Sequence, residues 1–203
     1  MNPIGSWRRL AFLAALSAAA AGCAVWNLPL PQEPGLHPQL TPYSYLEEGR
    51  LVSFLVDTEA ARRREDRPLV PLAVGVANIG LDHLTLTRES FTLVDDAGRR
   101  YAMAGVDEVR RGGPLPSYDR RLSAHAEGAF TGRFPFWPAV PAAFFPGVEE
   151  GLADSRVQLP QRSKMFTLLY FPHPAGRWLG RRYELWLDAA ELEEPVFVKF
   201  AVR

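Results

Sequence analysis

The chain has 203 residues, with 23 basic and 23 acidic side chains and a formal net charge of zero. Binding of nucleic acid requires a basic surface, which a balanced chain does not supply, so nucleic acid is excluded as a partner. The single cysteine excludes an internal disulfide and a cysteine-based metal site. A packed core must therefore stabilise the fold.

The first 22 residues have the pattern of an export signal. Arg8 and Arg9 form a positive start, residues 10–21 form an apolar run, and small residues precede Cys23. The pattern resembles the signal peptide of bacterial lipoproteins. The resemblance implies that cleavage follows Gly22 and that Cys23 becomes the acylated N-terminus of the mature protein.

Two other interpretations of this segment stay open. A transmembrane helix needs about 17 to 25 apolar residues, which is longer than this alanine-rich run. Ordinary secretion is also compatible, because Ala20 stands where lipoprotein signals usually carry leucine. If Cys23 is acylated as in that family, several acyl chains anchor the protein stably, since two or more suffice. Ala24 in place of aspartate then implies the outer membrane, facing the periplasm.

Residues 23–42 contain five prolines and almost no charge, which predicts an extended tether between the lipid and the domain. At about 3.1 Å per residue, this tether would reach about 60 Å. The alternative is that its apolar side chains dock on the domain. Those side chains are Trp26, Leu28, Leu30 and Leu36. Residues 43–203 have the length of one further domain.

From residue 43 onward, apolar and polar residues alternate between Gly, Pro and Asp, without extended helical periodicity. Strands are expected at 50–57, 72–77, 91–94, 99–103, 164–171, 182–187 and 195–202. Gly98 can take the left-handed conformation that closes a hairpin after Asp95. Some seven to nine short strands without helices predict an all-β fold, an antiparallel immunoglobulin-like β-sandwich.

Two segments carry a family resemblance. One is the valine-rich stretch 70–78, which ends in asparagine, and the other is the hairpin 91–101, which contains the run Phe-Thr-Leu-Val-Asp-Asp-Ala-Gly. Together they resemble the immunoglobulin-like domain of unknown function found in many bacterial lipoproteins. Residues 159–172 resemble a later strand of that domain, although Gln161 replaces its glycine. The resemblance implies placement outside the cytoplasm and a binding or structural role, and it brings no catalytic residue.

Residues 105–151 form an insertion that is long for a connection in a sandwich. Its segment 130–146 is rich in aromatic residues and proline, and it is too aromatic for disorder. One interpretation is that the aromatic side chains seal an edge of the sandwich. The other is that they form an exposed surface that contacts a protein or the membrane. The candidate interaction surface consists of Phe134, Phe136, Trp137, Phe144 and Phe145.

No motif for catalysis or for a cofactor is present. The four histidines are scattered, without the spacing that assembles a zinc site, and adjacent carboxylates fit turns and solvated loops better than acid–base chemistry. We therefore expect no enzyme activity, no cofactor and no metal. An enzyme would need a buried cluster that includes His125 and His173.

The leading hypothesis is a lipid-anchored, non-catalytic binding or assembly accessory of the cell envelope. Its partners would be the membrane, through acylated Cys23, and another envelope protein. The alternative is a periplasmic carrier of a small ligand or glycan. That alternative requires one pocket lined by Trp137, Trp178 and Trp186.

Overall fold

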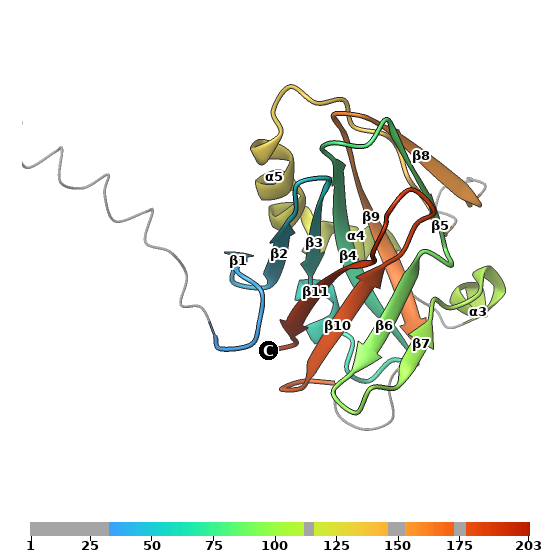
Figure 1. The fold of residues 1–203 in the computed structure, drawn as a ribbon. Helices are drawn as coiled ribbons and strands as arrows, with labels where there is room; N and C mark the ends of the chain where they lie inside the picture. The colour runs from blue at the N-terminus through green and yellow to red at the C-terminus, as the bar shows by residue number, and fades with distance from the viewer. Residues whose placement is uncertain (1–32, 112–115, 146–152, 173–177) are drawn as a thin grey trace, which may run out of the picture. The chain divides into compact units, whose positions relative to one another are not determined.

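The computed structural model describes residues 33–111, 116–145, 153–172 and 178–203 (Figure 1). The predicted signal peptide, the cleavage site between Gly22 and Cys23, and most of the predicted tether lie outside these residues. Among the helices in the described ranges, none has the length and apolar character needed to cross a membrane.

One antiparallel sheet of five strands has the order β1-β2-β3-β4-β9. Its strands are β1 (Gln39–Thr41), β2 (Ser44–Glu48), β3 (Val52–Asp57), β4 (Leu69–Asn78) and β9 (Ser163–Pro172). All ten residues of β4 are buried, as expected of a strand covered on both faces. β4 accommodates Pro71 because β3 pairs with it only as far as Ala73, so no ladder hydrogen bond is lost there.

A second sheet has the order β11-β10-β6-β7. Its strands are β6 (Phe91–Asp95), β7 (Arg100–Ala102), β10 (Arg182–Leu187) and β11 (Val196–Ala201). The predicted hairpin joins β6 to β7. Asp95 Oδ1 accepts hydrogen bonds from the backbone N–H groups of Ala97 and Arg99, both at 2.9 Å, and Gly98 has φ 79°. The turn chemistry is therefore as predicted.

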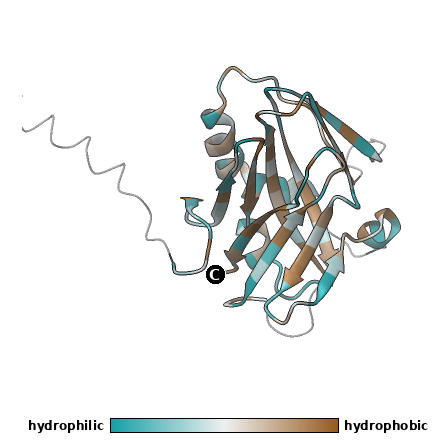
Figure 2. Ribbon diagram, in the orientation of Figure 1, coloured by the Kyte–Doolittle hydropathy of each residue, from teal (hydrophilic) through white to brown (hydrophobic). Residues whose placement is uncertain are grey.

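The two sheets pack face to face and enclose the main core. The rings of Phe54 and Phe91 join them at a centroid distance of 6.3 Å, and so do the rings of Tyr45 and Phe200. The strands carry most of the hydrophobic residues, whereas the β6–β7 turn is hydrophilic (Figure 2). A separate ribbon pairs β5 (His83–Thr87) with β8 (Arg156–Pro160). The predicted all-β antiparallel sandwich is confirmed.

The expectation of a sandwich without helices is wrong. In the described ranges the helices are α2 (Glu59–Arg62), α3 (Val106–Arg111), α4 (Pro116–Leu122) and α5 (Ala124–Arg133). α4 and α5 cover the face of the five-stranded sheet that is turned away from the sandwich core, where α4 contacts β9 and α5 contacts β1. Phe130 of α5 lies directly on Gly75 of β4, where a Cβ atom would be only 2.6 Å from the ring.

The domain begins earlier than residue 43, so the predicted boundary needs correction. Leu36 is 7% exposed and belongs to the core, and β1 lies wholly within the predicted tether. His37 N donates to Lys199 O at 3.0 Å, and Lys199 N donates to His37 Nδ1 at 2.6 Å. Of the two alternatives for the tether, docking holds for its described end, because these contacts attach it to β11.

Candidate functional site

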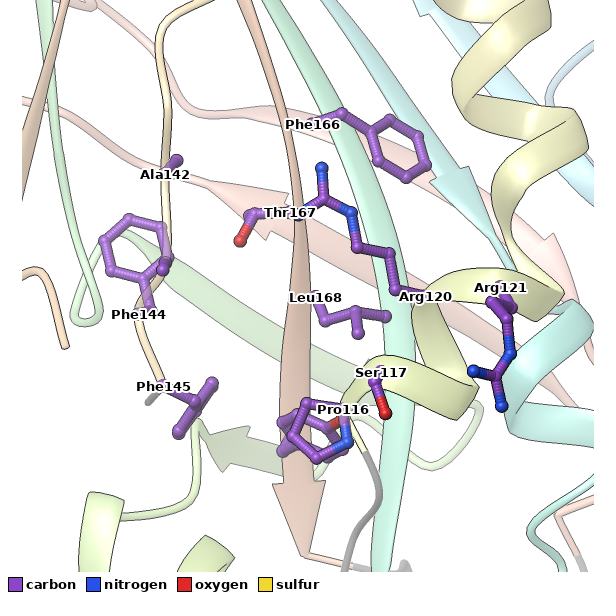
Figure 3. Close-up of a pocket in the computed structure, with 12 residues that line it drawn as sticks. Pro116, Ser117, Arg120, Arg121, Ala142, Phe144, Phe145, Phe166, Thr167 and Leu168 are labelled. Carbon is purple, nitrogen blue, oxygen red and sulfur yellow. The ribbon is translucent and has the colours of Figure 1, made fainter. Parts of the chain in front are cut away.

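A groove of about 520 Å³ lies beside β9, between α4 and the segment 142–145 (Figure 3). Leu168 and Phe166 of β9 contribute apolar surface, and Arg120 and Arg121 of α4 stand at the rim. The volume falls within the range of about 300 to 1,000 Å³ that ligand sites occupy. The groove is therefore large enough to bind part of another molecule.

The groove opens because the segment beside β9 changes its hydrogen-bond partner. Next to the first residues of β9, Val140 N donates to Lys164 O at 2.8 Å. Further along, Ala143 is bonded to Asp154 instead. Its N–H donates to Asp154 Oδ2 at 2.7 Å, and its C=O accepts from Asp154 N at 2.6 Å. This exchange directs the segment away from β9 and leaves a gap in the edge.

An exposed aromatic turn, residues 134–137, follows α5. The ring of Phe134 packs against Phe130 at a centroid distance of 5.4 Å and against Trp137 at 4.8 Å. Trp137 N donates to Phe134 O at 3.2 Å, which closes the turn. Phe136 is left 96% exposed. The turn thus presents one aromatic ring to solvent on a packed aromatic base.

Lys164 of β9 holds this turn in place. The residue is only 4% exposed, and its Nζ donates to Thr131 O at 3.1 Å and to Phe134 O at 2.6 Å. These are carbonyl groups at the C-terminal end of α5, where a positive charge is favourable. The sequence-based reasoning missed this role, although a lysine within a strand that is apolar on both faces is a visible signal.

The five residues of the predicted interaction surface do not stay together. Phe144 and Phe145 are 0% and 6% exposed and belong to the core, so they are not part of an exposed surface. Their burial follows from ring contacts inside the domain, between Phe144 and Phe91 at 5.8 Å and between Phe145 and Tyr170 at 5.2 Å. Phe134 and Trp137 are half-buried, and Phe136 is exposed. The aromatic segment is therefore buried in part and exposed at Phe136, and a contact of Phe136 with a protein or the membrane stays a prediction.

The three tryptophans proposed to line one carrier pocket lie apart. Trp178 is fully buried against Tyr183, at a ring distance of 4.2 Å, and Trp186 stacks on Phe197 in the second sheet at 5.0 Å. Trp137 belongs to the aromatic turn on the far side of the five-stranded sheet. The glycan-carrier hypothesis therefore loses its site, because one of these rings has no exposed surface and the others face different clusters.

Of the two histidines of the hypothetical cluster, the structure places only one. His125 is exposed on α5, and His173 lies outside the described residues. Within the described ranges, no group of three or more His, Cys, Asp or Glu side chains is placed to hold a metal ion.

A buried polar layer between the five-stranded sheet and the helices was not predicted. Asp119 of α4 is fully buried and accepts two hydrogen bonds from Arg64, at 2.8 and 2.9 Å, and one from the Tyr170 hydroxyl at 3.0 Å. Nearby, Asp57 accepts a hydrogen bond from Ser44 Oγ at 2.9 Å. Burial raises the pKa of Asp57 to about 6, against the opposing effect of its hydrogen bonds. The contacts of Asp119 with Arg64 and Tyr170 attach α4 to the sheet by directed hydrogen bonds.

These elements define the protein as an antiparallel β-sandwich with a helical cover on one sheet and a groove beside an edge strand. Its structure is similar to that of ycdA, a candidate lipoprotein of Bacillus subtilis strain 168, with 11% identity and a TM-score of 0.42. That likeness covers 77% of this chain and only 38% of the other. The yjhA protein of Bacillus subtilis is also similar, with 12% identity, a TM-score of 0.40, and coverage of 76% and 95%.

No family model matches the sequence, and no curated protein matches it. At this level of identity and structural agreement, neither solved structure bears on function. The resemblance to the immunoglobulin-like domain of bacterial lipoproteins stays a prediction. The function must be argued from the residues of this chain.

Proposed function

We propose that this chain is a lipid-anchored protein of the cell envelope and acts as a non-catalytic binding or assembly accessory. The anchor is Cys23, which carries a diacylglycerol on its sulfur atom and becomes the acylated N-terminus when the chain is cleaved after Gly22. The proposed location is the outer membrane, facing the periplasm. The partner is another envelope protein. The sequence pattern of residues 1–23 supports the anchor, and the aromatic turn supports the binding role.

The exposure of Phe136 is the observation that carries the binding role. The large hydrophobic side chains that stand exposed in the described ranges are Leu51, Tyr118 and Phe136, at 43%, 40% and 96%. Burial of a phenylalanine side chain contributes about 1.5 to 3 kcal/mol, which Phe136 does not gain within its own domain. An exposed aromatic ring on a turn that packed neighbours hold in place is typical of the few residues that dominate interface energies.

Co-purification from detergent-solubilised membranes, followed by mass spectrometry, tests the binding role. We expect a specific envelope protein with the wild type, and its loss with Phe136→Ser. Leu51→Ser is the matched control, because it removes a partly exposed apolar side chain from the β2–β3 turn. Circular dichroism must show that both variants are folded. Retention of the partner by Phe136→Ser, or recovery of no partner by the wild type, would contradict the proposal.

Metabolic labelling with radioactive palmitate tests the anchor independently. We expect label on the wild type and none on Cys23→Ser, because the sulfur atom is the acceptor of the diacylglycerol. The labelled protein should sediment with outer-membrane vesicles on a sucrose gradient. Label that persists in Cys23→Ser would refute the assignment of the anchor.

A further inference from the structure

The edge of β9 that faces away from β4 has backbone hydrogen-bond partners at both ends, whereas the described residues supply none to the stretch between. Lys164 N donates to Pro138 O at 3.0 Å, and Lys164 O accepts from Val140 N at 2.8 Å. At the other end, Tyr170 O accepts from Ala104 N at 2.8 Å. These backbone groups therefore point away from β4, which pairs with the opposite edge of β9.

The backbone groups of Phe166 and Leu168 must point in the same direction. In a strand, residues two apart direct their N–H and C=O groups to the same side, and Phe166 and Leu168 stand in step with Lys164 and Tyr170. The described part of the chain supplies no backbone partner on that side for either residue. Both residues line the groove. The groove is therefore a gap in a strand edge that presents two donors and two acceptors.

We propose that this gap binds an extended peptide segment of a partner protein by strand addition, and that the segment carries a carboxylate. The free stretch from Phe166 to Leu168 spans two residue steps, or about 7 Å at about 3.3 Å per residue. Its alternating N–H and C=O groups match a short stretch of the backbone of another strand. Apolar surface of Leu168, Phe145 and Ala142 surrounds them and fits the side chains of such a segment.

The carboxylate is inferred from the charges at the rim. Arg120 and Arg121 line the groove, and the described lining residues include no acid. Arg120 has a solvent-exposed ion pair with Glu127 at 3.2 Å, whereas Arg121 only lies over the ring of Tyr118, at 5.7 Å. Among the described residues Arg121 has no ion pair, and a cation at the rim without a facing carboxylate favours an acidic side chain or a free C-terminus in the bound segment.

This inference rests on the proposed role as a binding module, but it concerns a different surface from the aromatic turn. Phe136 is not among the residues that line the groove. The two surfaces can therefore be tested separately. Loss of the envelope partner by Phe136→Ser with peptide binding retained would assign the surfaces to two separate contacts.

The test begins with a phage-displayed library of random 12-residue peptides, selected on the full-length protein in detergent micelles. Selected peptides are synthesised with a fluorophore, and their affinities are measured by anisotropy. We expect sequences that alternate apolar and polar residues and contain Asp or Glu. Replacing that acid by its amide should weaken binding about threefold, as expected of a partly exposed ion pair. Arg121→Gln should do the same, whereas Arg110→Gln on α3 is the control and should not.

Backbone methylation distinguishes strand addition from other modes of binding. N-methyl groups on one alternate set of peptide residues remove hydrogen bonds to β9, and we expect about tenfold weaker binding, while the other set should have little effect. Bound peptide should also slow hydrogen exchange at the amides of Phe166 and Leu168. Failure to select any peptide, equal effects of both methylated sets, or unchanged exchange at both amides would overturn the proposal.

The outcomes also separate this inference from the proposed function. Selected peptides with the expected methylation pattern, but no envelope protein recovered from membranes, would reject the proposed function and keep the groove as a peptide site. Recovery of an envelope partner through Phe136, with no peptide bound by the groove, would reject this inference alone.

Discussion

Substitution of Gly75 by alanine should loosen the helical cover. An added Cβ would stand 2.6 Å from Cδ1 and 2.7 Å from Cε1 of Phe130, a ring that is fully buried. Because Gly75 is not among the glycines with positive φ, its backbone accepts alanine, and the clash is the unfavourable contribution. The ring must shift, and its shift disturbs the ring contacts from Phe130 to Phe134 and from Phe134 to Trp137.

The magnitude follows from two opposing effects. Overpacking of a close-packed site costs about 1 to 3 kcal/mol. Replacing glycine within a strand raises the free energy of unfolding by about 0.5 to 1 kcal/mol, because it reduces the conformational entropy of the unfolded chain. We therefore expect Gly75→Ala to lower the free energy of unfolding by about 0.5 to 2 kcal/mol.

Urea unfolding followed by circular dichroism measures this change. Gly128→Ala in α5 is the matched control, since a Cβ there meets nothing within 4 Å. It should stabilise the domain by about 0.8 to 1 kcal/mol, because alanine favours helix. In the double variant Gly75→Ala/Phe130→Leu, the smaller side chain should recover part of the loss. If Gly75→Ala proved as stable as Gly128→Ala, Phe130 could not lie on Gly75.

Three further variants test the buried polar contacts by urea unfolding. Lys164→Met should cost about 1.5 to 3 kcal/mol, because two buried carbonyls lose a charged donor; an unchanged midpoint would contradict this. Arg64→Met should cost about 3 to 5 kcal/mol, since it leaves the buried Asp119 carboxyl without its cation, and a loss below 1 kcal/mol would refute the pairing. The pKa of Asp57, about 6, lies above its ordinary value of 3.8, so its contribution to stability is complete below about pH 4. That contribution, about 3 kcal/mol, should be lost as the pH rises through about 6, and Asp57→Asn should abolish this part of the profile.

The sandwich was predictable because its strands follow simple local rules. The alternating residues of β10 and the fully apolar β4 are both visible as patterns, and β4 ends at Asn78 as predicted. Asn78 ends it by side-chain hydrogen bonds to Leu81 and to Leu159 O, the second of which no local pattern indicates. The pairing of β5 with β8 was missed for the same reason, since the two strands lie far apart in the sequence.

The helical cover was not predictable from periodicity. α5 buries only Ala126 and Phe130 and contains two glycines, so it shows no apolar stripe. The buried residue of α4 is Asp119, and a buried carboxylate is not a signal of a helix face. The groove could not be predicted either. It depends on the bonds between Ala143 and Asp154, which are tertiary contacts of an insertion rather than a motif.

The five-stranded sheet holds α4 by a different kind of interaction from the one that holds its sandwich face. The sandwich face buries aliphatic and aromatic side chains, whereas α4 is attached through Arg64, Asp119 and Tyr170. Exposure of apolar surface dominates the heat capacity and urea dependence of unfolding. Separation of α4 from the sheet should therefore show only a small change in heat capacity and a weak dependence on urea. We expect it as a local opening that requires less free energy than global unfolding. Because α4 forms one wall of the groove, the strength of these polar contacts sets the fraction of molecules in which the groove is widened.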